Sequence, residues 1–192
     1  MKKSLALLSI LSCLALPVVA STGIGIGIDL ASNYQYNLEK SFKNSMANSI
    51  SLNFKTNGGN VFYLRNETGS FSGEHGRAVA TVDEGTFGLG VRAPISKNIG
   101  VNVFLGKANT KFTNAANNGD SFGTAAYSET NPIIDFGAYG TKSYGDVNVG
   151  LDVTYRHHAL KEEIQNTNAG GQTEFINNRH GLRIGLRVGY GF

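Results

Sequence analysis

Three histidines near the end of the chain are the first residues whose type and spacing could do chemistry. His157 and His158 are adjacent, and His180 follows after a long polar stretch. If the segments that carry them pair as a hairpin, two imidazoles and the carboxylate of Glu162 or Glu174 would be enough to bind Zn²⁺ weakly. The spacing matches no diagnostic ligand pattern, so solvated histidines at the rim of the fold are the simpler interpretation. We therefore assign no metal site and no cofactor.

A catalytic use of these histidines can be compared with one known pattern. Lipid A deacylases carry a His-x-Ser motif on a late strand with a nearby Glu, and the segment that begins at His157 resembles this motif only in part. The serine position holds Ala159 when counted from His157, and Leu160 when counted from His158. Since the nearby glutamates cannot replace a hydroxyl nucleophile, we expect the chain not to be an enzyme.

Charged residues of both signs form the second set of interest, because they fall on the polar face of segments that alternate between apolar and polar residues. We expect these side chains to pair inside a small closed sheet, whose lumen eight strands would roughly fill. A narrow polar pathway is the alternative, because many inward positions are glycine. The predicted lumen charge network is Asp29, Arg65, Glu67, Arg92, Asp152, Arg156, Arg183 and Arg187, with Glu84 and Asp135 as further acidic members.

The charged residues share one face because apolar and polar residues alternate strictly along the segments that carry them. Every second residue is apolar from Leu182 to Phe192, and the same holds from Ile24 to Leu30. A period of two indicates a strand with one apolar and one polar face. Six further segments of this kind give eight strands, an even number that places both ends of the sheet on one side. The expected strands start near residues 24, 50, 61, 87, 99, 134, 147 and 182.

The connections between these segments alternate in length. Short turns and long polar loops on opposite sides are typical of an outer-membrane barrel. The short connections are Asn57–Asn60, Pro94–Asn98 and Thr141–Asp146, and the long ones are Glu39–Asn48, Ser72–Ala80, Asn109–Asn131 and Ala159–Asn177.

The apolar faces could pack against each other in a soluble secreted β-protein, or they could face lipid. Three features favour lipid: the polar face is unusually rich in glycine, that face carries both charge signs, and aromatic residues lie near the ends of apolar runs. We therefore predict an all-β, eight-stranded antiparallel up-and-down transmembrane β-barrel. The expected aromatic girdle is Tyr34, Tyr36, Tyr155, Tyr190 and Phe192.

The first twenty residues have the plan of a secretory signal peptide. Lys2 and Lys3 precede an apolar run, and small residues end it, which predicts cleavage after Ala20 and a barrel over 21–192. A lipid anchor on Cys13 is the alternative. Because Cys13 is the only cysteine, cleavage would leave no thiol for disulfides or zinc. The net charge of +3 includes both lysines, so the mature chain is close to neutral and no nucleic-acid partner is expected.

The last strand resembles the assembly signal of bacterial outer-membrane proteins, in which a terminal Phe and alternating apolar residues are read by the barrel-assembly machinery. Here Tyr190 and Phe192 occupy those positions. In pattern, the chain resembles the small barrels that include the OmpA transmembrane domain, OmpX-type proteins and Opa-type adhesins. The resemblance implies the outer membrane of a Gram-negative bacterium, with outer-membrane lipid and lipopolysaccharide as surroundings.

This class hosts several unrelated functions, so the function has to be argued from the site. We expect a structural or surface-interaction role, in adhesion or partner docking, through the long extracellular loops. In Asn109–Asn131, Phe112, Phe122 and Tyr127 stand among small polar residues, which suits a binding surface or a mobile polar loop. The alternatives are a narrow channel or transporter for small solutes or apolar molecules and, least favoured, a lipid-modifying enzyme.

Overall fold

Ten strands make up the part of the chain that the structure, a computed structural model, describes: residues 21–35, 45–75, 78–115, 127–158, 163–167, 173–177 and 180–191. They are β1 (Ser21–Gln35), β2 (Ser45–Thr56), β3 (Val61–His75), β4 (Ala78–Pro94), β5 (Ile99–Ala115), β6 (Tyr127–Tyr144), β7 (Val147–His158), β8 (Glu163–Thr167), β9 (Thr173–Asn177) and β10 (His180–Tyr190). None of these residues belongs to a helix long and apolar enough to cross a membrane.

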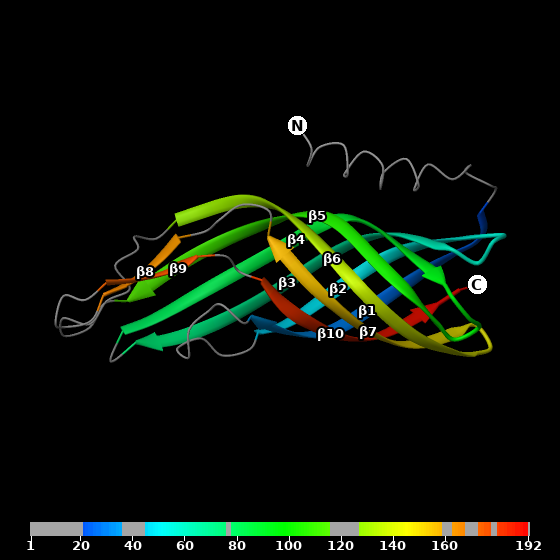
Figure 1. Cartoon of the computed structure of the whole chain (residues 1–192). Helices are drawn as coiled ribbons and strands as arrows, with labels where there is room; N and C mark the ends of the chain where they lie inside the picture. Colours follow the sequence, from blue (N-terminus) through cyan, green and yellow to red (C-terminus); the bar gives the residue numbers. More distant parts are fainter. Residues whose placement is uncertain are drawn as a thin grey trace, which may run out of the picture.

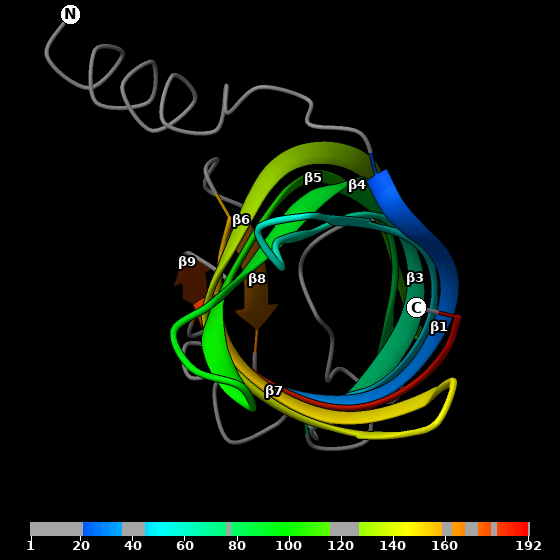
Figure 2. The same ribbon diagram turned by 90° about the vertical axis from the view of Figure 1, so that its right-hand side faces the viewer.

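Eight of the strands close into one antiparallel barrel, in the order β1-β10-β7-β6-β5-β4-β3-β2 (Figures 1 and 2). The first strand pairs with the last from Ile26–Tyr190 to Gln35–Gly181, so the sheet has no edge in this region. The predicted fold class is confirmed. β8 and β9 form a separate two-stranded sheet in the stretch between β7 and β10.

Short turns gather at the end of the barrel where β1 begins and β10 finishes (Figure 1). Gly59, with φ of +82°, allows the tight turn between β2 and β3, where its N–H donates to the carbonyl of Thr56 at 3.0 Å. Between β6 and β7 the turn is only two residues long, and Gly145 in it has φ of +62°. The N–H of Gly191 donates to the carbonyl of Asp146 at 3.0 Å, which ties the end of β10 to this turn.

The outward side chains of the middle strand segments form an apolar belt around the barrel. Ile28, Phe87 and Leu89 are 57, 61 and 62 % exposed, which is the orientation that a lipid-facing surface needs. Further members are Ile24, Ile26, Leu30, Ile50, Leu52, Val101, Phe136, Leu151, Val153, Leu186 and Val188.

Aromatic side chains border the belt at the turn end. Tyr144 and Tyr190 are both exposed, and Val147 lies between them in register. Of the other predicted girdle residues, Tyr155 is half-buried and packs on the Phe136 ring at 5.6 Å. The side chain of Tyr34 and the whole of Tyr36 and Phe192 lie outside the described residues.

At the opposite end, the strands are longer than the alternation predicted. The connection expected over Ser72–Ala80 shrinks to residues 76–77, because β3 reaches His75 and β4 starts at Ala78. The physical reason is that outward side chains are polar here, so the apolar signal ends while the ladder of backbone hydrogen bonds continues. For the same reason β5 and β6 occupy both ends of Asn109–Asn131, and β2 starts within Glu39–Asn48. β8 and β9 lie inside Ala159–Asn177. At the short-turn end, the turn predicted over Thr141–Asp146 shrinks to Gly145 and Asp146.

The predicted signal peptide lies outside the described residues, together with Cys13 and the expected cleavage site after Ala20. β1 starts at Ser21, the first residue of the predicted mature chain. Cleavage stays a prediction.

Close contact between β4 and β5 makes Gly88 a position where even one methyl group should destabilise the barrel. A Cβ there would lie 2.2 Å from the carbonyl oxygen of Leu105, whereas a Cβ on Gly85, in the same strand, would meet nothing within 4 Å. We expect Gly88→Ala to lower the free energy of unfolding by about 1–3 kcal/mol, and Gly85→Ala to change it by less than about 0.5 kcal/mol. Urea unfolding in lipid vesicles, followed by the gel mobility of folded and unfolded protein, measures both. Equal midpoints for the two variants would contradict the close packing.

Candidate functional site

Five arginines and five carboxylates point into the lumen and are almost completely buried. The structure brings together all eight predicted network residues and the two further acidic members, Glu84 and Asp135, so the two charge signs balance. They come from six of the eight barrel strands, since alternation turns every second residue inward. The set is Asp29 on β1; Arg65 and Glu67 on β3; Glu84 and Arg92 on β4; Asp135 on β6; Asp152 and Arg156 on β7; and Arg183 and Arg187 on β10.

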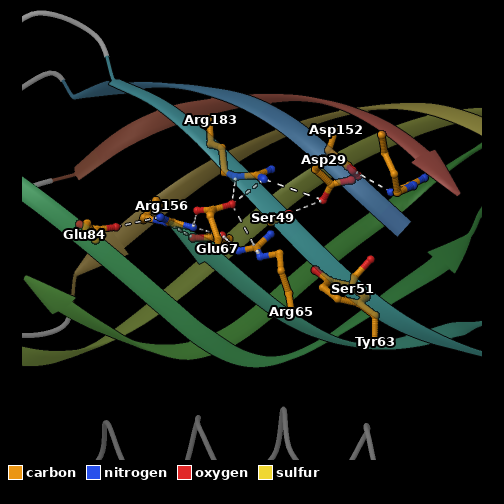
Figure 3. A network of polar contacts seen from close by, with 12 residues as sticks. Asp29, Ser49, Ser51, Tyr63, Arg65, Glu67, Glu84, Asp152, Arg156 and Arg183 are labelled. Atoms are coloured by element: carbon orange, nitrogen blue, oxygen red, sulfur yellow. Dashed lines mark hydrogen bonds and ion pairs between the residues drawn. The ribbon is translucent and has the colours of Figure 1, made fainter. Parts of the chain in front are cut away.

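Glu67 is the centre of the larger cluster, and Figure 3 shows it between three arginines. Its Oε2 accepts hydrogen bonds from Arg183 Nη2 at 2.6 Å and Nε at 2.9 Å. Its Oε1 accepts one from Arg156 Nη2 at 2.8 Å, and Arg65 Nε lies 3.9 Å from Oε2. A carboxylate with this many charged donors is held in one orientation.

Arg156 joins the same cluster to three carboxylates. Besides its bond to Glu67, Nη1 donates to Glu84 at 2.9 Å and Nε donates to Asp135 at 2.8 Å. Asp135 also accepts a short hydrogen bond from Arg65 Nη2. Each buried charge therefore has an opposite partner, which is the condition for keeping charges away from water.

A smaller cluster around Asp152 lies nearer the turns. Its Oδ2 accepts a hydrogen bond from Arg187 Nη1 at 2.7 Å and faces Arg92 Nη2 at 3.5 Å. Asn102 donates to its Oδ1 at 3.3 Å and accepts a hydrogen bond from the Tyr63 hydroxyl at 2.7 Å. The neutral residues complete the hydrogen bonding around this carboxylate.

Asp29 extends the larger cluster: it lies 3.9 Å from Arg183 and accepts a hydrogen bond from Ser49 at 3.1 Å (Figure 3). The two clusters are connected by a stack of aromatic rings and guanidinium groups. Tyr63 and Phe104 are parallel, with centroids 6.1 Å apart, and are flanked by Arg92 at 4.1 Å from Tyr63 and Arg65 at 3.8 Å from Phe104.

Apolar side chains occupy the lumen on the loop side of the network, and most of them were not predicted. Phe112 was expected in an exposed loop but is fully buried on β5, in the same inward phase as Phe104. This prediction was wrong because polar neighbours hid the strand. Of the other two loop aromatics, Phe122 and the side chain of Tyr127 lie outside the described residues. The remaining buried apolar residues of this region are Val82, Ala108 and Ile133.

The two adjacent histidines lie on opposite faces of the barrel wall. His157 is exposed on the outside, whereas His158 is buried in the lumen with Nε2 3.8 Å from Glu84. His157 pairs with His180 in the β7–β10 register, but the side chains of His180 and Glu174 are not among those described. Across the described side chains, no group of three His, Cys, Asp or Glu residues could hold a metal ion. Ala159, Leu160 and Glu162 lie outside the described residues.

No protein-family model matches the sequence, and the comparison with curated proteins finds no match. Among solved structures, Ail, the attachment invasion locus protein of Yersinia pestis, is similar with a TM-score of 0.53 and 14 % identity, over 88 % of this chain and 97 % of Ail. A major outer membrane protein from Thermus thermophilus is similar with a TM-score of 0.53 and 9 % identity, over 88 % of this chain and 99 % of that protein. The chain has the fold of a small outer-membrane β-barrel. The predicted resemblance is thereby confirmed.

The surface of this outer-membrane barrel agrees with its fold. The apolar belt lies on the outside and the paired charges lie inside, which reverses the arrangement of side chains in a soluble protein. This arrangement is that of a membrane barrel. The neighbours support the bacterial outer membrane as its location.

Removing the central carboxylate tests the network. Glu67→Gln keeps the shape of the side chain but leaves three arginines with one counter-charge fewer, so we expect a loss of about 3–5 kcal/mol in the free energy of unfolding. The matched control is Asp83→Asn, an exposed carboxylate on the outer face, where we expect less than about 0.5 kcal/mol. Urea unfolding in lipid vesicles measures both. A loss at Glu67 no larger than at Asp83 would mean that the network adds no more than surface charges do.

Proposed function

We propose that this barrel is a non-enzymatic surface protein of the outer membrane, with a structural or partner-binding role carried by the parts that project beyond the bilayer. One observation supports it most. Along β3 to β6, the outward side chains change from apolar to polar while strand pairing continues. The sheet therefore extends into water, where its outer face is open to partners.

The polar outward residues of this extension form a band that we call the polar collar. Small amides and hydroxyls dominate it, and Thr130 donates to the Asn109 side chain across two strands at 2.7 Å. Asp83 and Lys111 are directly opposite in register and give the collar both charge signs. The collar consists of Asn48, Asn66, Thr68, Ser70, Asp83, Asn109, Lys111, Ser128 and Thr130, all of them exposed.

The collar follows directly after the apolar belt, for example from Leu64 to Asn66 and from Phe87 to Asp83. With the short turns in the periplasm, the collar lies at the level of the saccharide of lipopolysaccharide, just outside the hydrocarbon of the outer leaflet. Part of the collar also borders a shallow polar depression. Amide and hydroxyl groups are suited to hydrogen-bond sugars, so we propose lipopolysaccharide as the lipid partner at the collar. A protein partner would dock on the connections beyond it.

The channel alternative has less support, because side chains fill the lumen. Arg65, Tyr63 and Phe104 are each at most 1 % exposed and stack across it. The enzyme alternative has less support as well, because His157 and His158 face opposite sides of the barrel wall. The structure of Ail was determined in complex with the heparin analogue sucrose octasulfate, which makes heparin a reasonable first probe here.

Cysteine labelling in intact cells tests the orientation and the extension together. A membrane-impermeant maleimide should label Thr68→Cys on the collar but not Leu89→Cys in the belt. It should label Ser96→Cys in a short turn only after the cells are permeabilised. The unsubstituted protein serves as the blank, since Cys13 lies in the predicted signal peptide. Labelling of Ser96→Cys in intact cells would contradict the proposed orientation, because it would place the short turns on the cell surface.

Adherence tests the surface role. We expect cells that display the protein to adhere to heparin-coated or matrix-coated plates several times more than cells whose residues 116–126 are replaced by a Gly-Ser linker of equal length. Heat-modifiable gel mobility of both proteins controls for folding. Equal adherence, together with discrete conductance steps of the pure protein in planar bilayers, would favour the channel instead.

A further inference from the structure

A cavity of about 260 Å³ opens at the turn-side mouth of the lumen. It lies at the opposite end of the barrel from the collar, and the proposed surface function does not use it. Arg92 and Arg187 line its inner part, and Lys55, near the end of β2, and Lys97, in the turn after β4, also line it. With the short turns in the periplasm, as proposed above, this cavity faces the periplasmic side of the membrane.

The charge around this cavity is one-sided. Four cationic side chains line it, and no carboxylate is among the described residues of the lining. The buried carboxylate of Asp152 accepts a hydrogen bond from Arg187 Nη1 and lies 3.5 Å from Arg92 Nη2. The described lining is therefore cationic, whereas the cluster around Glu67 combines both charge signs.

Arg92 has hydrogen-bonding capacity left over. It is 2 % exposed, and its guanidinium is fixed over the Tyr63 ring at 4.1 Å. Its Nη1 reaches Asn53 only at 3.5 Å, and its Nε and Nη2 have no hydrogen-bond partner among the described residues. Buried arginine donors normally find an acceptor, so these donors beside the cationic lining are suited to bind an anion.

Neutral donors complete the cavity. The amide of Asn53 and the hydroxyls of Ser96 and Tyr139 belong to the same lining. A planar arginine fork together with lysines and neutral donors is the chemistry that recognises phosphate oxygens.

We propose that the turn-side mouth of the barrel is a binding site for a phosphate oxyanion, held by Arg92 and Arg187 from within and by Lys55 and Lys97 at the rim. The phosphate could belong to a phospholipid headgroup of the inner leaflet or to a soluble phosphate of the periplasm. Both sources offer the same oxygens to the same donors. A cavity of this size admits the phosphate and a small substituent.

The test uses the full protein, refolded in a maltoside detergent that contains no phosphate. Inorganic phosphate is titrated by calorimetry, and acetate is titrated as the comparison anion. We expect Lys55→Gln and Lys97→Gln each to weaken phosphate binding about tenfold, the size of one charge-assisted hydrogen bond. Lys142→Gln is the matched control, because Lys142 lies at the same end of the barrel, next to the Tyr144 ring, and does not line the cavity.

A second arm titrates a short-chain phosphatidylglycerol in mixed micelles, with the same variants. Saturable binding of phosphate or of this lipid that is weakened at Lys55 and Lys97 but not at Lys142 supports the site, and the ligand that binds more tightly identifies the source. Three results overturn the proposal: neither probe binds, Lys142→Gln weakens binding as much as the rim variants do, or acetate binds as tightly as phosphate. Because this site is remote from the collar and the loops, its failure would leave the surface function untouched.

Discussion

The hydrocarbon layer offers no water to the backbone, and the rest of this structure follows from that constraint. Every N–H and C=O within the bilayer has to be paired inside the protein, so a sheet can enter only when it closes on itself. Closure between β1 and β10 removes the last edge but also creates an interior that eight strands leave too narrow for bulk water. The inward side chains must then satisfy one another. The balanced charges around Glu67 and the stacked rings of Tyr63 and Phe104 are two solutions to this problem.

The same constraint explains why the two ends of the barrel differ. Where the strands cross lipid, the outer face has to be apolar and the inner face polar. Beyond the lipid on the loop side, the outer face meets water, so Asp83 and Lys111 can point outward while Val82 and Phe112 pack inward. At the turn side the described residues that line the mouth of the lumen include four cationic side chains. The collar and the cationic cavity are thus consequences of where hydrocarbon ends, and each offers a partner a different chemistry.

Alternation in the sequence was enough to predict the class of fold, the number of barrel strands and the charged residues that share one face. It could not predict which arginine meets which carboxylate, because Arg183 reaches Glu67 across the lumen from a strand that does not pair with β3. That contact depends on the stagger of the strands around the whole barrel. Alternation also failed where lipid ends, since a strand whose outward residues are polar looks like a loop. Phe112 was misplaced for this reason, although it continues the inward phase of Phe104 by steps of two.

The closure of the ring has a consequence for the order of events during assembly. Glu67 meets Arg156 and Arg183 at separations of 89 and 116 residues, and Arg183 arrives on the strand that completes the circle. Until that strand docks, the carboxylate on β3 lacks one of its strongest partners and an open sheet still needs water on its inner side. Open sheet edges and unpaired charges are both unfavourable in hydrocarbon. The pairing of Glu67 with Arg183 therefore belongs to the closed ring and depends on the docking of β10.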